Sequence, residues 1–200
     1  TGGYWNFTGS KATSGISISK NTIIENATGG SGNDKIKGNS DDNTLTGNSG
    51  NNVLNGKGGI DVMTGNEGND TYYVNHVSDK VIEKAGGGID EIRSSVSKTL
   101  RAHVENLVLT GTANTTGQGN NSNNGLIGNS GNNVLNGKGG VDLLDGRLGN
   151  DVINGGAGRD TAVFSGRNNR INLNTTQLQN TLDGLDRLIS IENINAGGGQ

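Results

Sequence analysis

The sequence predicts an all-β solenoid of short parallel strands, and three observations lead to this fold class. A nine-residue unit of the form GGxGxDxUx, in which U is apolar, recurs along the chain, with its best copies at 29–37, 146–154 and 155–163. Its apolar eighth position returns at steps of nine residues. Only 28% of the 200 residues are apolar and 37 are glycine, so a conventional layered core is not expected.

Each position of the unit has a structural task. The glycines allow a tight turn, the sixth residue offers an oxygen, and the eighth side chain points inward. The neighbours of the eighth residue are mostly polar, as in Lys35 and Lys37, which is the alternation of a three-residue strand. Two nonapeptides per turn then place odd and even units in two facing sheets. The inward positions are Ile36, Leu45, Leu54, Met63, Tyr72, Val81, Val108, Leu126, Leu135, Leu144, Ile153, Ala162 and Ile171.

The quality of the repeat divides the chain into five segments. Residues 29–73 and 119–163 form two nonapeptide arrays, and NSGNNVLNGKGG at 48–59 returns identically at 129–140. We expect a degenerate solenoid spacer at 74–118 and an irregular β cap at 1–28. Residues 164–200 are expected to be an irregular β segment that leads into a further, truncated array. Leucine spacing at 176–191 could suit a helix, but Gly184 favours strand or loop.

The sixth positions are the candidate metal ligands, because carboxylate and amide oxygens suit calcium. Units eighteen residues apart should stack, which places Asp142 over Asp160 and Asp61 over Asp79, two carboxylates in each pair. The 142/160 pair is expected to bind most tightly, since the residues before Asp79 lack the glycines of the loop. Pairs with asparagine keep an oxygen but lose a charge, so they should bind more weakly. The complete set is Asp34, Asn43, Asn52, Asp61, Asp70, Asp79, Asn124, Asn133, Asp142, Asp151 and Asp160.

Several calcium ions are therefore expected to hold the coil together. The chain has no cysteine, so disulfides cannot do so. Calcium would remove the repulsion between stacked carboxylates, and folding should depend on the metal. Each turn is stabilised only through its neighbours, which makes that dependence cooperative.

These residues resemble the RTX (repeats-in-toxin) family, whose nonapeptides form parallel β-rolls, a right-handed β-solenoid with two short-stranded sheets. The resemblance implies calcium ligands from the glycine turn and position six, here Gly30, Gly32 and Asp34, or Gly156, Gly158 and Asp160. It also implies type I secretion and folding outside the cell. Residues 22–43 look most like the C-terminal region of serralysin-type secreted zinc proteases, which implies a catalytic domain elsewhere in the parent protein. The frequent asparagines and the stretch 104–119 depart from the family pattern.

Other function classes lack the residues they need. A net charge of −3 with scattered lysines argues against nucleic acid, and no apolar run reaches membrane-spanning length. The sequence has no HExxH, GxSxG or P-loop, and His76 and His103 are expected to face solvent. The segment is therefore expected to be non-catalytic in itself.

Two alternatives remain open, a polysaccharide-binding or adhesive module like those that accompany alginate epimerases and, with less support, a parallel β-helix polysaccharide lyase. Aromatic side chains near the ends of the arrays could bind extracellular polysaccharide, although such residues more often plug a solenoid core. They are Tyr4, Trp5, Phe7, Tyr72, Tyr73 and Phe164.

Overall fold

The structure is a computed structural model that describes residues 4–6, 15–17, 25–164, 171–181 and 183–196. All regular structure in these ranges is β-strand, and the strands form parallel sheets wound as a solenoid, which confirms the predicted fold class. Within these ranges no helix has the length and hydropathy needed to cross a bilayer. Phe7 and the last four residues of the predicted truncated array lie outside the described residues.

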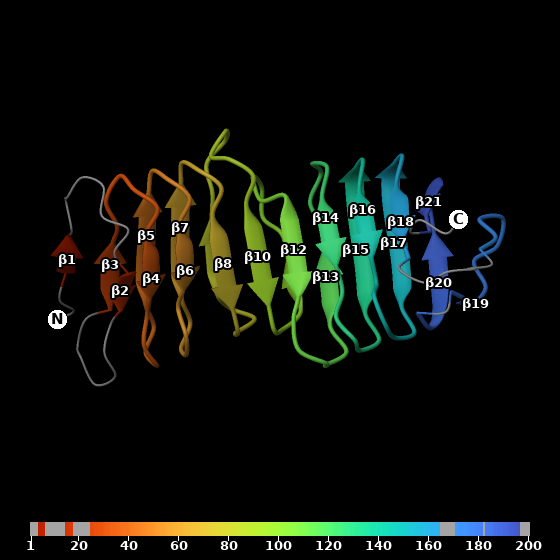
Figure 1. The fold of residues 1–200 in the computed structure, drawn as a ribbon, viewed down its shortest axis with the longest axis horizontal. Helices are drawn as coiled ribbons and strands as arrows, with labels where there is room; N and C mark the ends of the chain where they lie inside the picture. The colour runs from red at the N-terminus through yellow and green to blue at the C-terminus, as the bar shows by residue number, and fades with distance from the viewer. Residues whose placement is uncertain (1–3, 7–14, 18–24, 165–170, 182, 197–200) are drawn as a thin grey trace. The chain divides into compact units, whose positions relative to one another are not determined.

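The chain divides into two compact units, Thr1–Arg93 and Ser94–Gln200. In the first unit, one sheet has the order β1-β3-β5-β7-β9. Its strands are β1 (Tyr4–Asn6), β3 (Asn26–Thr28), β5 (Thr44–Asn48), β7 (Val62–Asn66) and β9 (Lys80–Ile82). The other sheet of this unit contains β2 (Gly15–Ser17), β4 (Lys35–Lys37), β6 (Val53–Asn55), β8 (Thr71–Val74) and β10 (Glu91–Ser94) in that order. Successive strands therefore alternate between two sheets (Figure 1).

The second unit repeats this arrangement. One sheet has the order β11-β13-β15-β17-β20-β19, and only its last pair is antiparallel. Its strands are β11 (Lys98–Thr99), β13 (Thr116–Gln118), β15 (Val134–Gly140), β17 (Val152–Gly158), β20 (Leu185–Ile189) and β19 (Gln179–Asn180). The facing strands are β12 (Asn106–Leu109), β14 (Gly125–Ile127), β16 (Leu143–Asp145), β18 (Thr161–Val163) and β21 (Asn193–Asn195).

The register shows why the nine-residue period produces this fold. Ile36 pairs with Leu54 and Leu126 with Leu144, each eighteen residues apart, so two units make one turn. Each of these side chains is fully buried between its two half-exposed or exposed neighbours. The core is thus a single file of inward residues, and each turn buries its apolar side chain only against adjacent turns. The residues in this file with at most 1% exposure are Ile36, Leu45, Leu54, Met63, Tyr72, Val81, Leu126, Leu135, Leu144, Ile153 and Ala162.

Two of the predicted inward positions are wrong. Leu107, and not Val108, pairs with Leu126, so the separation there is nineteen residues and Leu107 takes the fully buried place. Ile171 is only partly buried and belongs to no strand. Both errors follow from extra residues outside the arrays, which shift the register. The preference for strand or loop at 176–191 is confirmed by β19 and β20.

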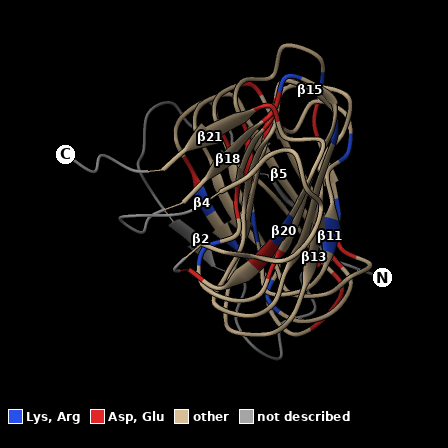
Figure 2. Ribbon diagram, turned by 90° about the vertical axis from the view of Figure 1, so that its right-hand side faces the viewer, with Lys and Arg blue, Asp and Glu red and all other residues tan. Residues whose placement is uncertain are grey.

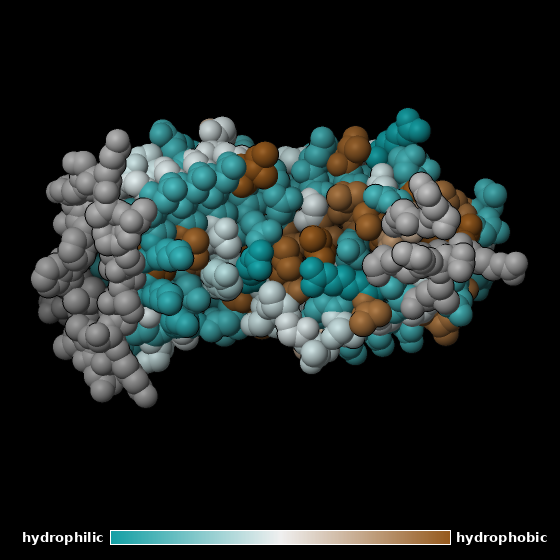
Figure 3. Space-filling model, in the orientation of Figure 1, coloured by the Kyte–Doolittle hydropathy of each residue, from teal (hydrophilic) through white to brown (hydrophobic). Residues whose placement is uncertain are grey.

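Side chains at the surface are mainly polar. Figure 3 shows a largely hydrophilic face with separate apolar areas, and Figure 2 shows Lys and Arg spread over several strands and loops. His76 and His103 are exposed, as expected. Tyr72 and Phe164 are 0% and 2% exposed, so these two aromatics fill the core, whereas Tyr73 is 41% exposed.

Candidate metal centre

The side chains at position six form two buried ladders in each unit, one for each series of loops eighteen residues apart. The first carboxylate or amide oxygen of one residue accepts the backbone N–H of the residue eighteen positions earlier. The Asp142 N–H donates to Asp160 Oδ1 at 2.8 Å, and the Asp61 N–H donates to Asp79 Oδ1 at 3.0 Å. The structure therefore stacks both of the predicted two-carboxylate pairs. The same contact is made by Asn52, Asp61, Asp70, Asp142 and Asp151 with Asp34, Asn43, Asn52, Asn124 and Asn133, respectively.

The ladders also include three residues that are not among the predicted ligands. The Asp70 N–H donates to Asp90 Oδ1, the Asp151 N–H to Asp186 Oδ1 and the Asp160 N–H to Glu192 Oε2, each at 2.8 Å. Asp90 lies twenty residues after Asp70, so its spacing carried a signal. The other two follow insertions, and their separations of 35 and 32 residues cannot be found from a nine-residue period.

In five loops the second carboxylate oxygen of position six is left without a donor. These are residues 56–61, 65–70, 137–142, 146–151 and 155–160, which we call the aspartate loops. Oδ2 of each aspartate is buried and has no hydrogen-bond partner among the described residues. Those aspartates are Asp61, Asp70, Asp142, Asp151 and Asp160.

The aspartate loops share one backbone conformation. Positions two and four both have positive φ, as at Lys138 (76°) and Gly140 (116°). A side chain at position one is excluded, because a Cβ on Gly137 would collide with Asp142 Oδ2 and lie 2.5 Å from the Gly155 carbonyl oxygen. The glycines therefore make room for the carboxylate and for the backbone oxygens around it.

Four other loops satisfy position six internally, and we call them the closed loops. In residues 29–34, 38–43, 119–124 and 128–133, an oxygen of the sixth side chain accepts the N–H of position two at 2.7–2.8 Å. The sixth residues are Asp34, Asn43, Asn124 and Asn133. In these loops positions two and four, Gly30 and Gly32 among them, do not have positive φ. Where position six is asparagine, its amide also donates to oxygens, as from Asn124 Nδ2 to Glu105 O at 3.1 Å.

Two of the predicted ligands belong to neither group. Asn52 stands in a loop with positive φ at Asn48 and Gly50, but its Nδ2 donates to Gly50 O at 2.8 Å. Asp79 Oδ2 accepts the N–H groups of Asn75 and His76 at 3.2 and 3.1 Å, and no residue of that loop has positive φ. The missing glycines thus give Asp79 a different environment from Asp61.

Burial penalises the charged form of Asp61, Asp70, Asp142 and Asp151. Desolvation, with a smaller contribution from the stacked Asp160, raises the pKa of Asp142 to about 6. Desolvation and the nearby Asp186 raise the pKa of Asp151 to about 7, and desolvation raises the pKa of Asp61 and Asp70 to about 6. A nearby cation would remove this penalty.

The aspartate loops fit a calcium ion. A buried carboxylate oxygen without a donor is costly unless a cation or a proton compensates it. Carboxylates and backbone carbonyls are the hard oxygen ligands that calcium takes in flexible geometry. Asp142 and Asp160, with the carbonyls of their turns, could hold such an ion, whereas the closed loops already satisfy their own oxygens.

Comparison with known proteins agrees with this geometry. The model of the RTX calcium-binding nonapeptide repeat matches the chain in four copies, within residues 24–54, 46–75 and 127–162. These segments overlap both arrays and contain all five aspartate loops. No protein of curated function matches the chain.

Proposed function

We propose, starting from the membership of both arrays in the RTX calcium-binding repeat family, that ions at the aspartate loops stabilise the fold of this module. The repeat is a calcium-binding element and not a catalytic one. The observation that carries the proposal is the set of five buried Oδ2 atoms that lack a donor. The ions supply the positive charge that the loops lack.

Asp142 and Asp160 form the first site to consider. Their carboxylates belong to consecutive turns of one edge, and the Oδ2 atoms of both lack a donor. Glycine turns with positive φ surround both, through Gly140, Gly156 and Gly158. Asp151 and Asp61 provide equivalent half-sites in their own loops. We expect the closed loops to hold their shape by hydrogen bonds without metal.

We further propose that the module serves type I secretion and folds outside the cell. The support is the family resemblance, together with a fold that buries a series of carboxylates. Calcium is scarce inside cells, so the carboxylate repulsion would keep the chain unfolded until export. On the same resemblance, the parent protein would be a secreted exoenzyme, such as a serralysin-like zinc endopeptidase with a separate catalytic domain.

The alternative of polysaccharide binding has weaker support. Of the aromatic residues considered for a sugar platform, Tyr72 and Phe164 are buried in the core. Tyr73 on the strand β8 is exposed, but a single exposed ring does not make a platform for a sugar. Binding of alginate or similar polyuronides in calcium would favour this alternative.

Titration with calcium tests the proposed function. Circular dichroism of the full chain should show a cooperative rise in β signal as calcium is added, and the melting temperature should rise with calcium concentration. Magnesium at the same concentration should have a smaller effect, because it dehydrates reluctantly and demands octahedral geometry. An equally folded and equally stable chain in a chelator would contradict the proposal.

A further inference from the structure

A cluster of three carboxylates in the first unit lies partly outside the nonapeptide pattern. Asp70 belongs to an aspartate loop, but Glu83 follows β9 and Asp90 precedes β10, both in the spacer. One oxygen of each carboxylate lies within 4.8 Å of the others. The three residues are 1%, 9% and 0% exposed, respectively, so the cluster is withdrawn from water.

The glycine-rich turn 84–90 creates this cluster. Gly86 has a φ of 73°, the Gly87 N–H donates to Lys84 O, and Gly87 O accepts the Gly68 N–H at 2.7 Å. The turn is two residues longer than a regular unit, and Asp90 still reaches the Asp70 N–H at 2.8 Å. Glu83 precedes this additional length. It lies eighteen residues after Gly65, at position one, where the aspartate loops have glycine, and it adds a second acidic residue at the same place.

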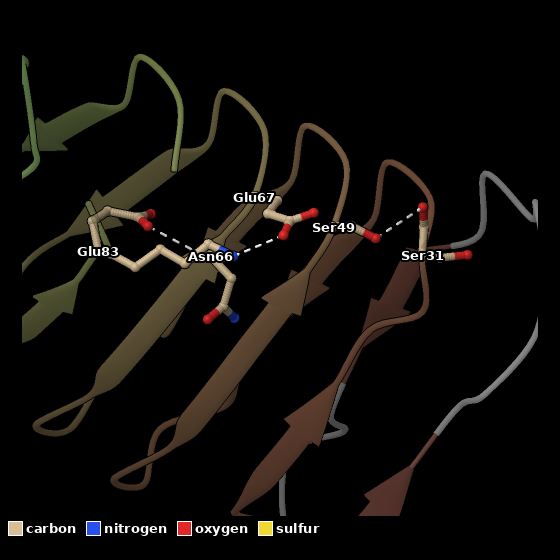
Figure 4. Close-up of polar contacts among 6 residues, drawn as sticks. Ser31, Ser49, Asn66, Glu67 and Glu83 are labelled. Atoms are coloured by element: carbon tan, nitrogen blue, oxygen red, sulfur yellow. Dashed lines mark hydrogen bonds and ion pairs between the residues drawn. The ribbon is translucent and has the colours of Figure 1, made fainter. Parts of the chain in front are cut away.

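The glutamate is fixed by two donors. Its Oε2 accepts the Asn66 N–H at 3.2 Å, as Figure 4 shows, and its Oε1 accepts the Tyr72 hydroxyl. The Tyr72 ring fills the inward position of β8, so the phenol is held by the core. These two contacts hold the Glu83 carboxylate close to Asp70, so Glu83 is a fixed side chain and not a mobile one.

The arrangement lacks a positive charge at its centre. Asp70 Oδ2 is buried and has no hydrogen-bond partner among the described residues. This oxygen, Glu83 Oε1 and the Tyr72 hydroxyl converge on the place that a Cβ of Gly65 would fill. The neighbouring base, Lys84, instead pairs with Glu67 at 2.9 Å on the surface. The glycine thus leaves a small space lined by oxygen atoms.

We propose that Asp70, Glu83 and Asp90 bind a divalent cation, calcium, at a site whose second and third carboxylates come from the spacer. Three ionised carboxylates around one point repel one another, and a dication offsets two of their three negative charges. All donors are hard oxygens, which excludes a preference for soft thiolate-binding metals. The site would close the first array, because it ties the last aspartate loop to the irregular turn that follows.

Native mass spectrometry of the calcium-loaded full chain tests this proposal. Glu83→Gln keeps the size of the side chain and an oxygen for the Asn66 N–H, but removes one ligand charge. We expect this variant to retain one calcium ion fewer than the wild type. Asp90→Asn keeps the oxygen that accepts the Asp70 N–H and should give the same loss, so it serves if Glu83→Gln does not fold. Glu67→Gln is the matched control, since it removes the same charge from an exposed neighbour and should change no ion count.

The outcomes separate this site from the proposed function. If the wild type binds several ions and both spacer variants bind as many with unchanged affinity, the spacer site is overturned while the aspartate loops stand. If the wild type binds no calcium, both proposals fail. Loss of one ion in the spacer variants, with the control unchanged, supports the site.

Discussion

The hexapeptide GNSGNN occurs at 47–52 and again at 128–133, and the structure folds the two copies differently. In the first copy, Asn48 and Gly50 have φ values of 79° and 93°. In the second, Asn129 and Gly131 do not have positive φ, and the Gly131 N–H instead donates to Asn129 Oδ1 at 2.7 Å. The residues that follow, GKGG, take the same left-handed turn in both units. Identical sequence therefore does not determine the loop type here.

The turn that precedes each copy explains the difference. Asn48 Nδ2 donates to Gly29 O at 2.6 Å. The Ser49 hydroxyl donates to Ser31 O, as Figure 4 shows. Asn129 Nδ2 meets another set of oxygens, those of Thr110 and Ala113 at 3.2 and 3.0 Å. The first copy lies on a glycine-rich turn and the second on the spacer sequence TGTANT, so each loop adapts to the carbonyls beneath it.

The largest change in the free energy of unfolding should come from a substitution in an aspartate loop. Calcium should reverse the sign of this change. Asp142→Asn keeps the oxygen that accepts the Asn124 N–H but loses the charge for the ion. At saturating calcium the variant should be less stable by about 3 kcal/mol, the value of a ligand at roughly one hundred times its Kd. In chelator at neutral pH it should be more stable by about 1–3 kcal/mol, because the raised pKa means that the ionised carboxylate opposes folding.

Chemical denaturation in calcium and in chelator measures both values for Asp142→Asn. Asp42→Asn is the matched control, since Asp42 is exposed and its Oδ1 accepts the Ile60 N–H, a role that asparagine can keep. The same sign of change in both buffers would show that Asp142 is a structural residue and not a ligand.

The next prediction uses the two copies of the hexapeptide directly. Asn52→Asp places a carboxylate in a loop that already has the positive φ values of the aspartate loops. The variant should bind one more calcium ion and be more stable in calcium. Asn133→Asp places the same carboxylate in a closed loop and removes the amide that donates to Thr115 O at 3.3 Å. It should cost about 1–3 kcal/mol in chelator and add no ion. Ion counts by native mass spectrometry, with melting curves, compare the pair, and equal counts would show that loop type does not control binding.

These residues also show how far the sequence predicts the structure. The file of inward residues and the eighteen-residue stacking follow from the nine-residue period of the two arrays, so Leu54 and Leu144 could be placed correctly. Whether a loop has positive φ at positions two and four or is closed depends on the preceding turn of the solenoid. The sequence of a single unit does not contain that turn. Asp186 and Glu192 reach the ladders only through insertions of irregular length, so no spacing rule finds them. Glu83 lies at position one, eighteen residues after Gly65, but the repeat predicts glycine there and not a ligand.

A smaller effect is expected at position two of a closed loop. Asn129→Ala removes the amide that donates to Thr110 O, Ala113 O and Thr115 Oγ1. It also removes the oxygen that accepts from the Gly131 N–H and from Asn133 Nδ2. The loss should be about 1–2 kcal/mol and the same with and without calcium, because these bonds replace the metal in this loop. Urea denaturation of the variant in both buffers gives the two values. A larger loss in calcium than in chelator would mean that the closed loop also takes part in metal binding.

The smallest effect concerns the left-handed residues of the aspartate loops. Lys138 has a φ of 76°, a conformation that costs a residue with a side chain about 1–2 kcal/mol relative to glycine. Glycine at this position removes the strain but loses more entropy on folding, by roughly 0.5–1 kcal/mol. Lys138→Gly should therefore stabilise the second unit by no more than about 1 kcal/mol, seen as a slightly higher melting temperature in calcium. Lys98→Gly, in the strand β11, should destabilise instead, and a stabilising effect there would show that the gain at 138 does not arise from the left-handed backbone.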